Sequence, residues 1–309
     1  MGHKSSPRSF SHCHATLAAL MTLMLVLATG YAQGTKPPTL PPLTTVPDNP
    51  RLPGKFVWAD LVTDDISAAK KFYGALFGWS FSDYGGYIIA KNDERPVCGM
   101  FQRPRPADQP QARPRWFGYI SVANVDKARN AVLNAGGHEL AAPKKLPDRG
   151  QQAVFADAEG AIFGVVKSSS GDPEDFLADP GDWIWIQLLS RDAKHASEFY
   201  QAVGGYDMVE NNSTNRQTDY ILTSGGYARA TVRTIRTDDA RVTPNWLPFI
   251  RVSSVSESVA KARELGGKIL VEPKLELLDG RVAVIADPTG AAIGLMEWSG
   301  EPANRGKTS

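Results

Sequence analysis

The sequence is poor in cysteine and histidine, the two side chains that most often build metal and redox sites. Its 309 residues include two cysteines and five histidines. Cys13 and Cys98 alone supply neither a disulfide framework nor a paired zinc-ligand motif. A net charge of +1 gives no basic surface, so we expect no nucleic-acid partner. The motifs of phosphate-binding loops, dinucleotide-binding folds and serine hydrolases are also missing.

A targeting segment opens the chain. His3, Lys4 and Arg8 precede the uncharged stretch ATLAALMTLMLVLATGYA, which ends in small residues at Ala32. Its apolar centre spans about 12 residues, short of the ~20 that cross a bilayer. We therefore expect residues 1–32 to be a signal peptide, and the protein to be exported, periplasmic or secreted, with no membrane contact after cleavage. An uncleaved membrane anchor is the alternative.

Cleavage after residue 32 would leave only two histidines in the chain. His138 begins an expected strand, and His195 lies in the polar part of an expected helix. We expect both at the surface and not as metal ligands. Cys98 lacks a neighbouring base and is expected to be a small buried side chain.

A proline-rich spacer, residues 33–54, precedes two copies of one domain. Its seven prolines favour an extended segment. From residue 55 onward, motifs recur after 127 to 130 residues, a period too long for a solenoid repeat. The phrase FADAEGAIFG (155–164), for example, returns as IADPTGAAIG (285–294). We expect domains at 55–168 and 183–299, a linker at 169–182 and a tail at 300–309.

Each copy divides again into two similar halves. The stretch FVWADLV alternates as a strand does, and ISAAKKFYGALFG has helical periodicity after a capping Asp65. Short strand candidates follow, and the pattern restarts near Trp116. This predicts two βαβββ units per domain in an α+β fold, with helices outside a cupped mixed sheet. The segments PDRG and LLDGR, ahead of the seventh strand of each copy, predict turns.

These motifs together resemble the vicinal oxygen chelate superfamily, the glyoxalase, bleomycin-resistance and extradiol-dioxygenase group. The resemblance rests on TDDISAAKKFYGALFGW, NVDKARNAVLNAGG and DPTGAAIGL, and it covers residues 55 to about 299. It implies tandem glyoxalase-like domains of paired βαβββ units. In family enzymes, histidines on the first and fifth strands and carboxylates on the fourth and eighth hold a divalent metal.

This chain departs from the family at those metal positions. The fourth strands, VCGMFQ and YARATV, contain no carboxylate. The other positions hold residues that are not metal ligands: Trp58 or Ala59, Phe117 and Gly164 in the first copy, and Trp185 or Ile186, Leu247 and Gly294 in the second. Glu297 is a solvated strand-end carboxylate or, as an alternative, a displaced ligand. We therefore expect no bound metal and predict no cofactor.

Strand alternation indicates what lines each cup instead. An apolar surface with a few polar groups is typical of a small-molecule site. Trp116 and Trp246 fall on the opposite parity and should pack beneath the helices. The candidate ligand-binding residues are Trp58, Asp60, Phe117, Tyr119, Trp185, Gln187, Phe249, Arg251 and Arg229. Each could equally be an ordinary core or solvated residue.

Three functions remain open at this point. The first is an exported tandem protein that binds a small organic molecule without a metal. The second is an enzyme of the superfamily, a lyase, isomerase or dioxygenase, whose metal ligands are displaced. The third is a structural or assembly role with empty cups. The sequence also leaves a homodimer open.

Overall fold

The computed structural model describes residues 40–44, 49–104, 113–211, 218–236 and 242–298. The expected signal peptide and C-terminal tail lie outside these residues. Among the helices of the described residues, none combines the length and the apolar character needed to cross a membrane.

The two domains contain the same order of elements, βαβββ four times in succession. The first domain consists of β1 (Phe56–Thr63), α2 (Ile66–Phe77), β2 (Ser80–Asp83), β3 (Tyr87–Asn92), β4 (Arg95–Gln102), β5 (Arg115–Ser121), α3 (Val125–Asn134), β6 (His138–Leu146), β7 (Gly150–Ala156) and β8 (Ile162–Ser168). The second consists of β9 (Trp183–Ser190), α4 (Ala193–Gly204), β10 (Asp207–Asn211), β11 (Asp219–Ser224), β12 (Tyr227–Thr234), β13 (Asn245–Val252), α5 (Val255–Glu264), β14 (Lys268–Val271), the 3-10 turn η1 (Leu278–Gly280), β15 (Val282–Ala286) and β16 (Ala292–Glu297). The predicted α+β class is confirmed.

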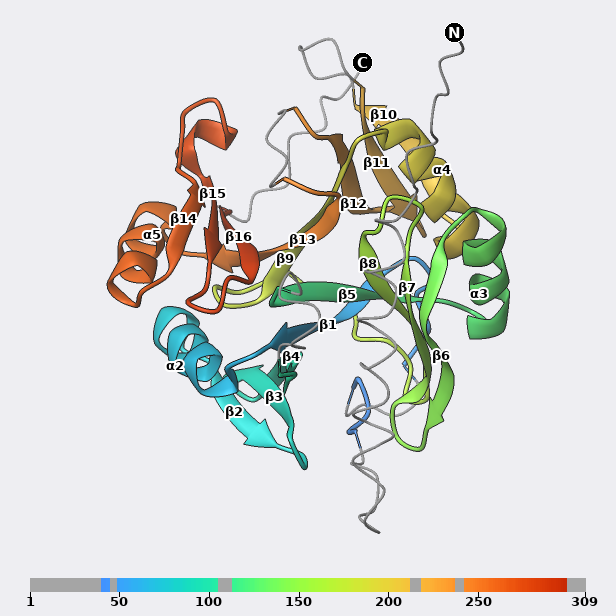
Figure 1. The fold of residues 1–309 in the computed structure, drawn as a ribbon, viewed down its shortest axis with the longest axis horizontal. Helices are drawn as coiled ribbons and strands as arrows, with labels where there is room; N and C mark the ends of the chain where they lie inside the picture. The colour runs from blue at the N-terminus through green and yellow to red at the C-terminus, as the bar shows by residue number, and fades with distance from the viewer. Residues whose placement is uncertain (1–39, 45–48, 105–112, 212–217, 237–241, 299–309) are drawn as a thin grey trace, which may run out of the picture.

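Each domain forms one eight-stranded mixed sheet from its own two units. The strand order is β2-β3-β4-β1-β5-β8-β7-β6 in the first sheet and β10-β11-β12-β9-β13-β16-β15-β14 in the second. In both sheets the two units join through their first strands, β1 against β5 and β9 against β13, which run antiparallel. The helices lie on one side of each sheet (Figure 1).

Local sequence sets where the helices begin and end. The carboxylate of Asp65 accepts a hydrogen bond from the amide of Ala68 (2.9 Å), as predicted, and Asp192 caps α4 in the same way. These caps satisfy backbone donors that have no partner inside the helix. Gly78 ends α2 with a positive φ of 77°, a conformation that favours glycine.

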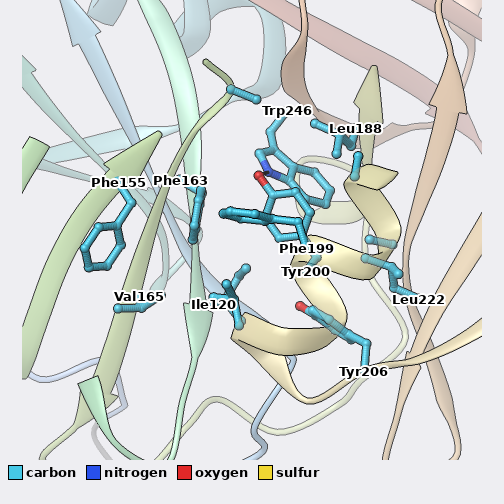
Figure 2. Packing of buried hydrophobic residues seen from close by; sticks show 14 of the residues in the cluster. Ile120, Phe155, Phe163, Val165, Leu188, Phe199, Tyr200, Tyr206, Leu222 and Trp246 are labelled. Atoms are coloured by element: carbon cyan, nitrogen blue, oxygen red, sulfur yellow. Dashed lines mark hydrogen bonds between the residues drawn. The ribbon is translucent and has the colours of Figure 1, made fainter. Parts of the chain in front are cut away.

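The two domains meet through their helix-bearing sides and share two buried cores. In one core, side chains of β5, α3, β7 and β8 contact those of β9, α4, β11, β12 and β13 (Figure 2). In the other, α2 and strands of the first domain contact α5, β15 and β16 of the second. Each of the two cores therefore contains side chains of both domains, so that the two sheets form one folded body.

Residues of the repeated motifs form buried hydrogen bonds where the two domains meet. The hydroxyl of Tyr200 donates to the carboxylate of Asp157 in the other domain (3.0 Å) and accepts from the indole of Trp246 (2.8 Å). In the mirrored position, Tyr73 accepts from Trp116 (2.9 Å). Burial and the charge of Asp287 raise the pKa of Tyr73 well above its usual range. The predicted location of both tryptophans beneath the helices is confirmed.

The two glycines that end the repeated phrase allow a neighbouring ring to lie flat on the sheet. A Cβ at Gly164 would stand 2.2 Å from the ring of Tyr119, and one at Gly294 would stand 2.1 Å from the ring of Phe249. A side chain at either position would displace that ring. This close approach explains why glycine occupies the eighth-strand position in both copies.

Candidate functional site

Each sheet has one face turned away from the helices, which we call its helix-free face. On the first sheet, the predicted residues Trp58, Phe117 and Tyr119 are buried together on this face. On the second sheet, residues of the same parity on β9 and β13, Trp185 and Phe249 among them, occupy the matching face. The alternation predicted from the sequence is therefore correct for both sheets.

A buried carboxylate lies at the centre of the helix-free face of the first sheet. Asp60 is 4% exposed. Its Oδ1 accepts hydrogen bonds from the hydroxyl of Tyr87 (2.6 Å) and the indole of Trp58 (3.0 Å), and its Oδ2 accepts one from the hydroxyl of Tyr119 (2.9 Å). The indole of Trp58 also contacts the Tyr87 hydroxyl at 2.9 Å. These four side chains form one connected network, called the Asp60 network below.

Gly99 on the neighbouring strand makes room for the Asp60 network. A Cβ there would stand 1.9 Å from the Tyr87 hydroxyl and 2.2 Å from Oδ1 of Asp60. Gly99 pairs directly with Asp60 across β1 and β4. The fourth strand thus has no side chain at this position, where the Tyr87 hydroxyl and Asp60 take up the space, whereas the family resemblance implies a carboxylate on this strand.

Burial changes the acidity of the network. It raises the pKa of Asp60, an effect that the hydrogen bond from Tyr87 and the charge of Arg149 partly oppose. Burial and the charge of Asp60 raise the pKa of both Tyr87 and Tyr119 well above the usual range. Both hydroxyls therefore remain protonated and act as donors to the carboxylate.

Arg149 lies over the same face from the turn between β6 and β7. It is 2% exposed, and its guanidinium lies 4.5 Å from the ring of Trp58. Its Nε, Nη1 and Nη2 are all buried without a hydrogen-bond partner among the described residues. A buried guanidinium with no acceptor is costly, because its five N–H donors have lost water without replacement.

The segment expected to be a spacer lies against this face where it is described. Leu40 and Leu43 are 6% and 5% exposed and belong to the same buried cluster as Trp58, Tyr87 and Phe117. Figure 1 shows residues 40–44, in blue, between β3 and β6. Burial of the two leucines means that residues 40–44 pack against the first domain and are not free-standing; the extended conformation that the prolines favour stays a prediction.

The helix-free face of the second sheet has different chemistry. Gln187 replaces Asp60, and Phe249 replaces Tyr119, so the second face has no equivalent of the Asp60 network. The indole of Trp185 donates instead to Thr231 (2.9 Å). Trp185 and Gln187 are only half-buried, and no separate buried cluster of described residues forms on this face.

The two arginines predicted for the second face bind the linker between the domains. Arg229 forms an ion pair with Asp175 (2.7 Å), which also pairs with Lys55 (3.0 Å). Arg251 donates to the carbonyl of Ala178 and to that of Trp298 (2.8 Å). Both guanidiniums thus have acceptors within the chain, in contrast to Arg149.

The residues at the family's metal positions do not fit a divalent ion. Within the ranges that the structure covers, no group of three His, Cys, Asp or Glu side chains could hold a metal. His138 and His195 are exposed, and Cys98 is a buried free thiol, all as expected. Glu297 accepts a hydrogen bond from the amide of Val255 (3.0 Å), so it caps α5.

Sequence reasoning missed two members of the first face, Tyr87 and Arg149. Tyr87 begins β3, where the sequence predicts a strand but gives no partner for the hydroxyl. Arg149 lies in the segment PDRG, for which the sequence predicts only a turn. A comparison of the two copies could have identified Arg149. Position 149 is arginine in the first copy, whereas the equivalent residue of the second copy, Asp279, is an exposed acid.

Comparisons with known proteins agree with the observed architecture. The family described as bleomycin resistance protein-like N-terminal matches residues 55–87. The chain is 30% identical over 248 residues to a putative glyoxylase, CFP32, of Mycobacterium tuberculosis, covering 78% of this chain and 93% of that protein. It is also 30% identical over 273 residues to the anthracycline biosynthesis protein DnrV of Streptomyces peucetius, covering 83% and 98%.

Solved structures share the fold at lower identity. A Mn(II)-bound glyoxalase from Novosphingobium aromaticivorans matches with a TM-score of 0.55 and 17% identity, covering 80% of this chain and 82% of that one. An extradiol ring-cleaving dioxygenase from B. fuscum matches with a TM-score of 0.57 and 14% identity, covering 86% and 77%. At such identities these structures show the fold alone.

Proposed function

The chain belongs to the vicinal oxygen chelate superfamily, and we propose that within this superfamily it binds a small organic molecule, without a metal, on the helix-free face of its first sheet. The observation that carries this proposal is the Asp60 network. A desolvated carboxylate, two protonated tyrosines and an indole converge on one apolar, aromatic surface. Few convergent polar groups in apolar surroundings, one with a perturbed pKa, are typical of small-molecule sites.

The second sheet supports this location by contrast. It has the same topology and the same tryptophan at Trp185, yet Gln187 and Phe249 leave the position that matches Asp60 uncharged. The buried carboxylate of this sheet, Asp219, is paired with Arg233 (3.0 Å) and Arg236 (3.3 Å). The members of the Asp60 network satisfy one another, but the guanidinium beside it, Arg149, has no acceptor among the described residues. An unsatisfied buried guanidinium is costly in an exclusively structural role, and this supports a binding role for the first face. We therefore assign binding to the first face and linker anchoring to Arg229 and Arg251 of the second.

The test uses the matched tryptophans as each other's control. The chain beginning after residue 32 is screened by tryptophan fluorescence against carboxylates, quinones and phenolics. Trp58→Phe should weaken binding of a hit by at least about tenfold, since it removes a donor to Asp60 and replaces the indole beneath Arg149 with a smaller ring. Trp185→Phe should leave the affinity unchanged. Loss of binding in Trp185→Phe alone would move the site to the second face, and a silent screen would favour a structural role.

The relatives favour one further candidate, an enzyme of glyoxalase type. One relative is named as a putative glyoxylase, and a structural neighbour is a Mn(II)-bound glyoxalase. Such an enzyme would need metal ligands away from the family positions. Elemental analysis of the purified protein separates the candidates, because a stoichiometric metal that supports turnover would replace the binding proposal with the enzymatic one.

We also propose that the protein is exported and that its first 32 residues are removed. The basic start, apolar centre and small residues before Gln33 support this proposal. N-terminal sequencing of the protein from a cell fraction outside the inner membrane should begin at Gln33. A chain that begins at Met1 in the cytoplasm would contradict it.

A further inference from the structure

We propose that the ligand of the first face is an organic carboxylate with an apolar or aromatic body, and that Arg149 binds its carboxylate group. This inference rests on the proposed function and specifies its ligand class. The observations behind it are the unsatisfied guanidinium of Arg149, the hydrogen bonds that already engage Asp60, the excess of arginine on this face, and the apolar side chains that surround it.

Arg149 has the geometry of a prepared anion site. Its carbonyl accepts from the amide of Ser169 (3.2 Å), which fixes the turn, and Gly150 keeps a positive φ of 109° beside it. The guanidinium stacks on Trp58 and leaves three buried nitrogens without acceptors among the described residues. Because a guanidinium is planar and always protonated, a carboxylate can take two parallel hydrogen bonds from it.

The two acids discussed for this face, Asp60 and Asp172, accept hydrogen bonds from other donors, although Oδ1 of Asp172 has no partner among the described residues. Asp60 accepts from Trp58, Tyr87 and Tyr119, and it forms no ion pair with Arg149. Asp172, which is fully buried, accepts through Oδ2 from the amide of Leu52 (2.6 Å) and the hydroxyl of Ser121 (2.5 Å). Among the described residues, therefore, the positive charge of Arg149 lacks a hydrogen-bonded anion.

More positive charge lies at the other end of β5. Arg115 shares the parity of Phe117 and Tyr119, and Arg103 follows β4 two residues after Phe101. Burial lowers the pKa of Arg115, and the charge of Arg103 lowers it further. Nη2 of Arg103 is buried without a partner in the part of the chain that the structure describes. The charge on this face thus favours an anion over a neutral ligand.

The remainder of the face is apolar and accommodates the body of such a ligand. Trp58, Tyr87, Phe101 and Phe117 surround the polar groups. Leu40 and Leu43 are buried on the same cluster and contribute apolar side chains from outside the sheet. An aromatic or branched apolar body could displace these two leucines and replace their contacts.

Benzoate and its neutral counterpart benzamide test the inference. Binding of both to the chain that starts at residue 33 is measured by calorimetry, in wild type, Arg149→Met and Arg263→Met. The last variant removes an exposed arginine of α5 and serves as the matched control. We expect wild type to prefer benzoate over benzamide by at least about tenfold, and Arg149→Met to lose about tenfold in benzoate affinity alone.

The other outcomes separate failure of the carboxylate inference from failure of the proposed function. Equal affinity of wild type for benzoate and benzamide, or unchanged benzoate affinity in Arg149→Met, overturns the carboxylate inference and leaves the binding function standing. If neither compound binds but a neutral compound from the fluorescence screen does, with dependence on Trp58, the carboxylate inference also fails alone. If no compound of any class binds, the proposed function fails with it.

A second variant at position 149 distinguishes loss of the binding geometry from misfolding. Arg149→Lys keeps the positive charge but not the planar fork. It should fold as wild type does by circular dichroism and bind benzoate with an affinity between those of wild type and Arg149→Met. Lysine binding benzoate as tightly as arginine would contradict the two-bond geometry of the proposed site.

Discussion

The two sheets share one topology, but their helix-free faces have diverged. The first face buries a carboxylate under two tyrosines and an unsatisfied arginine, with Leu40 and Leu43 packed on it. The second is half-buried, carries Gln187 and Phe249 at the matching positions, and uses its arginines to hold the linker. The sides that bear the helices have instead stayed alike.

This contrast separates what the duplicated fold requires from what function requires. The Tyr–Trp pairs and the Asp residues of the repeated phrase recur because each completes the core between the domains. Among the described residues, the buried cluster on the first helix-free face is separate from the two shared cores, so its residues are freer to change. One copy can then specialise for binding while the other stabilises the body, and the differences between copies mark the site better than their similarities.

Gly99→Ala should have the largest effect on stability among the substitutions compared between the two faces. Its Cβ would collide with the Tyr87 hydroxyl and with Asp60, so the variant both overpacks the face and breaks the Asp60 network. We expect a loss of roughly 3 kcal/mol or more in the free energy of unfolding. Urea denaturation measures this directly.

Thr231→Ala is the matched substitution in the second sheet, since Thr231 pairs with Gln187 as Gly99 pairs with Asp60. It removes one hydrogen bond from Trp185 and creates no collision, so its cost should be about 1 kcal/mol. Equal losses in the two variants would mean that the first face is no more tightly packed than the second.

Replacing Leu40 and Leu43 together by alanine should loosen only the first face. Truncation of buried leucines removes apolar contact with Tyr87 and Phe117, at a cost of up to about 2 kcal/mol for each in a segment that can collapse locally. Hydrogen exchange should quicken in β3 and β4 and stay unchanged in β11 and β12. Benzoate should bind more tightly, because less apolar contact must be displaced; weaker binding would show that the leucines are part of the site.

Arg229→Met tests the second sheet, where the substitution should lower stability slightly and leave ligand affinity unchanged. It removes the ion pair with Asp175, which retains Lys55 as a partner, so the loss of stability should be about 1 kcal/mol. Affinity of the screened ligand should stay within about twofold of wild type, which is within the usual spread for a distant site. Loss of binding in this variant would return the second face to consideration.

The sequence predicted the fold well because the fold depends on periodic signals. Alternation placed Trp58, Asp60 and Tyr119 on one face, and the repeat fixed where each unit begins. The same logic could not place Arg149, because strand alternation does not set the direction of a side chain in a turn. Leu40 and Leu43 were hidden by the surrounding prolines, since composition predicts an extended chain but not what that chain packs against.

The smallest expected effect is in the pH dependence of the free energy of unfolding. Comparison of wild type with Asp60→Asn assigns this effect to Asp60. Burial raises the folded-state pKa of Asp60 above its unfolded value, which lies near 3.8. The ionised group therefore destabilises the fold at neutral pH, and this cost disappears as the pH falls through the folded-state pKa toward the unfolded one. Wild type should gain stability relative to Asp60→Asn over that window, by an amount on the order of 1 kcal/mol.

Urea denaturation of both proteins at neutral and mildly acidic pH measures this difference, since all other titrating groups cancel. Gln187→Glu supplies the second-sheet counterpart. Its carboxylate would be only half-buried, so its pKa should rise less and its stability should change less with pH than that of wild type relative to Asp60→Asn. A larger pH effect from position 187 than from position 60 would mean that the second face, and not the first, is the desolvated one.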